Sequence, residues 1–121
     1  MFGLRRFRFR SPERDRASAE RRLGLIQSAV RTAIAEAEAE SKGLRLRVAK
    51  TRSSVVSLQA QIEGRETDPA CRAELSNLEH ALLTGERSLA QLEDHLIALR
   101  KLERRLDRLL NQAYVAAVRL P

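Results

Sequence analysis

Cysteine, proline, glycine and aromatic residues are all scarce in this chain of 121 residues. Its single cysteine, Cys71, excludes an intrachain disulfide and a thiolate metal cluster. Three prolines and five glycines leave long stretches without a helix breaker, and the four aromatic rings comprise three Phe and one Tyr. What remains is dominated by Ala, Leu, Glu and Arg, a composition typical of long helices and coiled coils.

Membrane-spanning and targeting segments are also missing from the sequence. No run reaches the roughly 18 apolar residues that a membrane-spanning helix requires. The segment Met1–Arg6 lacks the apolar core of a signal peptide, and its glycine is third, which breaks the N-myristoylation pattern. Arg outnumbers Lys 20 to 3, which we interpret as the coding bias of a GC-rich bacterial genome. We therefore expect a bacterial cytoplasmic protein, with the inner membrane surface as a peripheral location.

Catalytic and metal-binding patterns are not found either. His80 and His95 are 15 residues apart, too far for the spacing that places two ligands on one helix face. Cys71 has no neighbouring base, and no glycine-rich phosphate loop occurs. The sequence therefore predicts no enzyme, no cofactor, no metal and no small-molecule substrate.

Two apolar stripes of similar length are the main positive feature. The first comprises Leu23, Val30, Ile34, Ala37, Leu44, Val48, Val55, Leu58 and Ile62. The second comprises Leu75, Leu78, Leu82, Leu89, Leu92, Leu96, Leu99, Leu106 and Leu110. Each occupies the a and d positions of a heptad repeat, and partners counted outward from the middle have residue numbers that sum to 133. A constant sum is what antiparallel pairing requires, so the sequence predicts an all-α fold: a long antiparallel two-helix coiled-coil hairpin with a short basic N-terminal arm.

Capping residues give the expected boundaries. Ser11 precedes Pro12 and Asp68 precedes Pro69, and each pair suits an N-cap followed by the first helical residue. Gly64 suits the end of the first helix. We expect an arm over 1–11 and a hairpin over 12–121, with helices over 12–64 and 69–118 and a turn over 64–69.

Several positions of the predicted seam between the helices are imperfect. Under the same sum, Gly85 faces Val48, Ser41 faces Leu92 and Glu103 faces Val30. Small residues allow close approach of the helices, and single polar residues fix register. The segment 41–43, which contains Gly43, is the expected place for a bend. Basic residues of 42–52 are expected opposite three carboxylates, Glu74, Glu79 and Glu86.

The arm carries the sharpest local motif, in which Arg6, Phe7, Arg8 and Phe9 alternate. Arginines can contact phosphates while rings stack on unpaired bases, or the rings can insert at an anionic membrane surface. Docking on a partner protein as an edge strand is a third interpretation, and a basic tail without a partner is a fourth. The tail without a partner stands first among these interpretations, followed by protein docking, the membrane and nucleic acid.

Apolar residues also lie off the seam. Leu83, Ala90 and Ile97 recur every seven residues at b positions, and Leu46, Ala49, Val56 and Ala60 trace an outer line on the first helix. Contiguous exposed apolar surface usually marks a partner site, so we expect self-association or a different partner helix. Tyr114 belongs to an apolar C-terminal run that the hairpin register returns beside the start of the first helix.

Together these features predict a non-enzymatic adaptor or scaffold protein that mediates protein–protein assembly. The candidate partner-binding residues are Arg6, Phe7, Arg8, Phe9, Leu83, Ile97 and Tyr114. In size and design the chain resembles the small coiled-coil stalk or escort proteins of flagellar and type III secretion ATPases. That resemblance is one of architecture, so it implies that the joined termini engage a protein such as the ATPase but assigns no residue roles. The alternative is a peripheral membrane or nucleic-acid-associated protein that binds through the basic arm.

Overall fold

The computed structural model describes residues 11–63 and 68–118. Two α-helices account for nearly all of them: α2 spans Pro12–Glu63 with 52 residues, and α3 spans Pro69–Val118 with 50. No strand occurs in these two ranges. The prediction of an all-α helical hairpin is therefore confirmed. The arm residues 1–10 and Gly64 lie outside the described ranges.

Both helices begin with the caps expected from the sequence. The Ser11 hydroxyl accepts a hydrogen bond from the Arg14 backbone N–H at 3.3 Å. At the start of α3, the Asp68 carboxylate accepts one from the Ala70 backbone N–H at 3.0 Å. These side chains satisfy backbone donors that have no partner inside the helix, which fixes where each helix starts.

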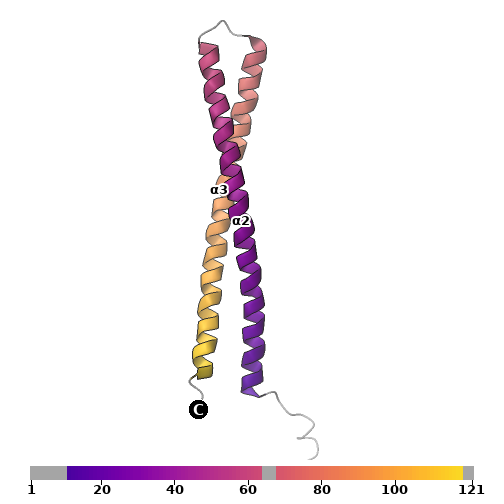
Figure 1. The fold of residues 1–121 in the computed structure, drawn as a ribbon, viewed down its shortest axis with the longest axis vertical. Coiled ribbons are helices and arrows are strands. Elements are labelled where there is room, and N and C mark those ends of the chain that lie inside the picture. The colour runs from indigo at the N-terminus through magenta and orange to yellow at the C-terminus, as the bar shows by residue number, and fades with distance from the viewer. Residues whose placement is uncertain (1–10, 64–67, 119–121) are drawn as a thin grey trace, which may run out of the picture. The chain divides into compact units, whose positions relative to one another are not determined.

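Figure 1 labels the two helices α2 and α3. The chain divides into two compact units, each containing a segment of α2 and a segment of α3. We call residues 1–33 and 99–121 the terminal unit and residues 34–98 the turn unit. α2 continues through 41–43 as helix, so the chain is not broken there; a bend of the helix axis at these residues stays a prediction. Gly43 costs helix propensity there without interrupting the backbone hydrogen bonds.

Burial follows the predicted seam along both helices. Every a and d position from Arg16 to Ile62 and from Cys71 to Ala113 is buried or half-buried. The most buried apolar side chains are Val30, Ile34, Ala37, Val48, Val55, Leu58, Leu92, Leu96 and Leu106. A seven-residue repeat of burial on both helices is compatible with coiled-coil packing.

The imperfect seam positions have local explanations. A Cβ atom added to Gly85 would lie 3.0 Å from Val48 Cγ2, so glycine permits a close approach of the helices there. Ser41 is buried, with 4% of its surface exposed. The carboxylate of Glu103 reaches Arg31, with its Oε2 atom 3.5 Å from Arg31 Nε. The seam therefore tolerates this acid because its charge has a partner at the rim.

Candidate partner-binding surfaces

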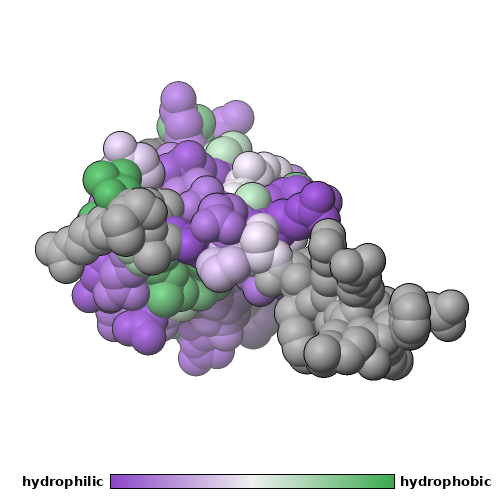
Figure 2. Space-filling model, turned by 90° about the horizontal axis from the view of Figure 1, so that it is seen from below, coloured by the Kyte–Doolittle hydropathy of each residue, from purple (hydrophilic) through white to green (hydrophobic). Residues whose placement is uncertain are grey.

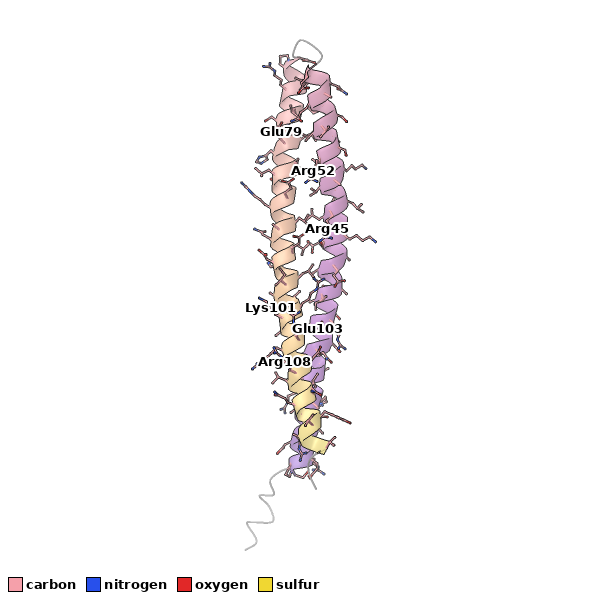
Figure 3. The ribbon with its side chains drawn as sticks, turned by 90° about the vertical axis from the view of Figure 1, so that its left-hand side faces the viewer. Arg45, Arg52, Glu79, Lys101, Glu103 and Arg108 are labelled. Atoms are coloured by element: carbon pink, nitrogen blue, oxygen red, sulfur yellow. The ribbon has the colours of Figure 1, made fainter. Side chains whose placement is uncertain are left out.

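One edge of the turn unit carries a regular series of polar contacts between α2 and α3. Arg45 Nη2 lies 3.3 Å from Glu93 Oε1, and Arg52 Nη2 lies 2.7 Å from Glu86 Oε1. Gln59 donates a hydrogen bond to Glu79 at 3.4 Å. Figure 3 labels Arg45, Arg52 and Glu79 along this edge. Steps of seven residues up α2 match steps of seven down α3, which is compatible with antiparallel pairing.

The partner expected for this basic stretch was partly wrong. The sequence rule placed the bases of 42–52 opposite Glu74, Glu79 and Glu86, whereas Arg45 contacts Glu93. Partners in this series sum to 138 and not to 133. The reason is that these residues occupy e positions on both helices. An e residue follows a d position by one on α2, and it follows the paired a position by four on α3. The sum of the two residue numbers therefore rises by five, from 133 to 138.

The terminal unit has the same type of edge. Arg31 lies between two carboxylates, at 3.5 Å from Glu103 and 3.8 Å from Asp107. The Gln27 side-chain amide donates a hydrogen bond to Asp107 at 2.6 Å. We call the edge that carries these contacts in both units the paired edge.

The candidate residues Leu83 and Ile97 lie on the outside of α3 in the turn unit. Their exposed fractions are 46% and 51%, and Ala90 between them is exposed as well. On α2 of the same unit, Leu46 and Val56 are also exposed. These side chains contribute little to the seam, so they are available to other molecules; that they bind a partner remains a prediction.

A second exposed apolar pair was not singled out from the sequence. Ile26 on α2 and Leu102 on α3, both in the terminal unit, are 48% and 45% exposed. Both fall at g positions of the heptad phase, and that shared position is the signal that sequence reasoning overlooked. We call the edge defined by these two residues the open edge.

The candidate residues near the chain ends are less completely placed. Arg6, Phe7, Arg8 and Phe9 lie outside the described residues. Tyr114 is described and is 66% exposed. Seen end-on, the described surface is mainly hydrophilic with separate hydrophobic spots (Figure 2). An end patch that joins Tyr114 to the arm remains a prediction.

Residues of catalytic or ligand-binding type do not cluster in the part of the chain that the structure describes. Within 11–63 and 68–118, no group of three or more His, Cys, Asp and Glu side chains is arranged to hold a metal ion. Cys71 is half-buried beside the N-cap, with its Sγ atom 3.9 Å from an Asp68 carboxylate oxygen. Neither α2 nor α3, as described, is long and apolar enough to cross a membrane.

Comparison with known proteins gave no relative from which a role can be transferred. No protein-family model matches the chain, and searches of curated proteins and of solved structures found no match. The surfaces described above are therefore the basis for any assignment of function.

Proposed function

We propose that this protein is a non-enzymatic adaptor or scaffold that mediates protein–protein assembly through outward-facing side chains of a coiled-coil hairpin. The observation that carries the proposal is the exposure of Leu83 and Ile97, two large apolar side chains spaced by two heptads on one helix. Complete burial of such a side chain contributes about 1.5–3 kcal/mol, and about half of each is still exposed, so a helical partner gains roughly 1 kcal/mol by covering each one.

The chemistry of the remaining surface supports the same class of protein. Polar contacts close the paired edge at intervals of seven residues, as at Arg45 and Arg52. Exposed ion pairs are each worth roughly 0.2–1 kcal/mol and specify orientation more than stability. A hairpin of this kind is suited to presenting contacts at fixed positions along its helices. The resemblance in architecture to stalk and escort proteins of secretion ATPases makes a bacterial cytoplasmic assembly part of the proposal.

Uneven charge favours a second candidate function. The terminal unit carries 15 Lys and Arg against 5 Asp and Glu, a balance of +10, whereas the turn unit carries 8 against 11, a balance of −3. A unit with this charge attracts phosphate-bearing surfaces. The alternative function is therefore association with an anionic membrane surface or nucleic acid through the basic arm and its neighbours.

The adaptor proposal is tested by Leu83→Glu combined with Ile97→Glu. We call Leu83, Ala90 and Ile97 the outer line of α3. Two carboxylates on this line prevent a partner helix from packing there, because burying unpaired charge is costly. The seam is untouched, so helicity by circular dichroism should be unchanged. Assembly, measured as solution mass and as recovery of partners from the native host, should be lost.

A matched control is Ala81→Glu combined with His95→Glu. These residues are exposed, lie on the same helix with the same spacing, and fall at g positions away from the outer line. The control should keep its assembly. If the wild type is monomeric and recovers no partner, or if both double variants behave alike, the proposal is wrong.

A further inference from the structure

The open edge lies on the opposite side of the terminal unit from its ion pairs. Ile26 precedes Arg31 by five residues, and Leu102 precedes Asp107 by five, which is a rotation of about 140° around each helix. Arg31 and Asp107 are paired at 3.8 Å. Both apolar side chains therefore lie on the edge where no described ion pair joins the helices.

The open edge continues along the terminal unit at seven-residue steps. Ala19 and Ala33 share the heptad position of Ile26, and Leu109 shares that of Leu102; all three are half-buried. In the turn unit the same positions hold polar or small residues: Glu40, Arg47, Ser54, Gln61, Glu74, Ala81, Ser88 and His95. The apolar edge is thus a property of the terminal unit alone among the described residues.

Basic side chains border this apolar edge. Arg22 precedes Ile26 by four residues, and Arg105 follows Leu102 by three, so each lies on the same helix face as its apolar neighbour. Both arginines are exposed. Further out on α3, Lys101, Arg104 and Arg108 are exposed too; Lys101 and Arg108 are labelled in Figure 3.

The acids of the terminal unit leave this border uncompensated. On α3, Glu103 and Asp107 are its acidic residues, and both are directed to Arg31 on the paired edge. On α2, its acids are Glu13, Asp15 and Glu20, all within the first three turns. From Arg21 onward the α2 segment of this unit has no acid at all.

Charge decides which occupant fits. A second copy docked edge to edge would place Arg22 and Arg105 against their equivalents, and like charges disfavour that arrangement. If nucleic acid bound here, Ile26 and Leu102 would lie in the middle of the contact. Bases stack on aromatic side chains, and neither of these two residues is aromatic. A helix with an apolar stripe flanked by carboxylates satisfies both the apolar centre and the basic border.

We infer that the open edge of the terminal unit, centred on Ile26 and Leu102 and bordered by Arg22 and Arg105, binds an acidic amphipathic helix of a partner protein. This inference rests on the proposed adaptor function and specifies the chemistry of one partner. It concerns a different surface from Leu83 and Ile97, so failure of the inference is distinguishable from failure of the proposed function.

Binding of a designed peptide to the full-length chain tests the inference. The probe is a fluorescent amphipathic peptide of about 21 residues, with Leu at the a and d positions of its heptads and Glu at the flanking positions. Its affinity should fall at least about tenfold on combining Ile26→Gln with Leu102→Gln. Leu46→Gln with Val56→Gln, which removes two exposed apolar side chains from α2 in the turn unit, is the matched control and should bind as the wild type does.

Charge exchange provides the specificity test. Arg22→Glu combined with Arg105→Glu should weaken binding of the Glu peptide and strengthen binding of the same peptide with Lys in place of Glu. Helicity should stay unchanged, because both residues are exposed. A merely structural effect of the substitutions would weaken both peptides alike and would overturn the inference.

Three further outcomes would also overturn it. The first is no binding of the Glu peptide up to about 1 mM. The second is a change in what the edge recognises. Either a Glu peptide whose Leu residues are replaced by Ser binds equally well, or a DNA duplex or anionic vesicles displace the Glu peptide with the same dependence on Ile26 and Leu102. The third is loss of self-association in the Ile26→Gln and Leu102→Gln variant, because a second copy would then be the occupant.

Failure of the inference is distinguishable from failure of the proposed function. A chain that loses assembly with Leu83→Glu and Ile97→Glu but binds no acidic peptide remains an adaptor without this partner. If the chain binds the peptide through Ile26 and Leu102 but its assembly is unaffected by Leu83→Glu and Ile97→Glu, the open edge is a binding site and the proposed role of Leu83 and Ile97 is wrong.

Discussion

Among the described glycines of the two helices, Gly85 is the one at which an added Cβ atom would meet the other helix. A Cβ atom there would lie 3.0 Å from Val48 Cγ2, and Val48 is buried with 5% of its surface exposed. A valine in a helix has essentially one favourable χ1 rotamer, so its methyl group cannot turn away cheaply. A Cβ atom added to Gly43, within α2, would meet no neighbouring side chain within 4 Å, so that position faces open space.

Alanine substitutions at these two glycines should therefore have different effects on stability. Gly43→Ala should raise the free energy of unfolding by up to about 1 kcal/mol, because it gains helix propensity without a clash. Gly85→Ala gains the same propensity but overpacks the seam at a cost of about 1–3 kcal/mol, so it should be neutral or destabilising by up to about 2 kcal/mol. Thermal unfolding followed by circular dichroism measures both, and a Tm that rises equally in the two variants would contradict the close approach.

At the scale of the helices, the paired edge of the turn unit specifies which residues of α2 meet which residues of α3. Reversing one charge, Arg52→Glu, places a carboxylate beside Glu86 and should lower the free energy of unfolding by up to about 1 kcal/mol at low salt. Adding Glu86→Arg should restore it. A double-mutant cycle by chemical denaturation measures the coupling energy between the two side chains. Zero coupling at low salt would show that the ion pair does not contribute to stability.

The seam register is tested by a disulfide cross-link within the turn unit. With Cys71→Ala as background, Leu44→Cys and Leu89→Cys sum to 133 and should form a disulfide readily. The control pair, Leu44→Cys with Leu82→Cys, is offset by one heptad, about 10 Å along the helix, beyond the usual reach of a disulfide. Equal cross-linking of the two pairs would contradict a fixed register.

Much of the helix architecture was predictable because long-range order here follows from local repetition. Apolar residues at a and d positions, together with the caps at Ser11 and Asp68, predicted a hairpin of two helices. The partners of Arg45 and the apolar edge at Ile26 and Leu102 were not predicted. The rule of 133 pairs residues at a and d positions only. The partners of side chains at the flanking e and g positions depend on the direction in which each side chain leaves its helix, which the rule does not specify.

For the molecule as a whole, the main asymmetry is electrostatic: +10 for the terminal unit against −3 for the turn unit. Residues 1–10 contribute four of the arginines. Deleting them should leave partner recovery through Leu83 and Ile97 unchanged under the adaptor proposal. The deletion should abolish binding to anionic vesicles or nucleic acid under the alternative, and that binding should weaken steeply with salt. Vesicle co-sedimentation and nucleic-acid titration at several salt concentrations separate the two.

Assembly through the outer line of α3 is tested by site-specific photo-cross-linking in the native host. A photoreactive phenylalanine analogue is placed in turn at 83 and 97, and at the control positions 81 and 95 on the same helix. If assembly occurs through this line, protein adducts form from 83 and 97 and are absent from 81 and 95. Equal adducts from all four positions, or none from 83 and 97, would contradict it.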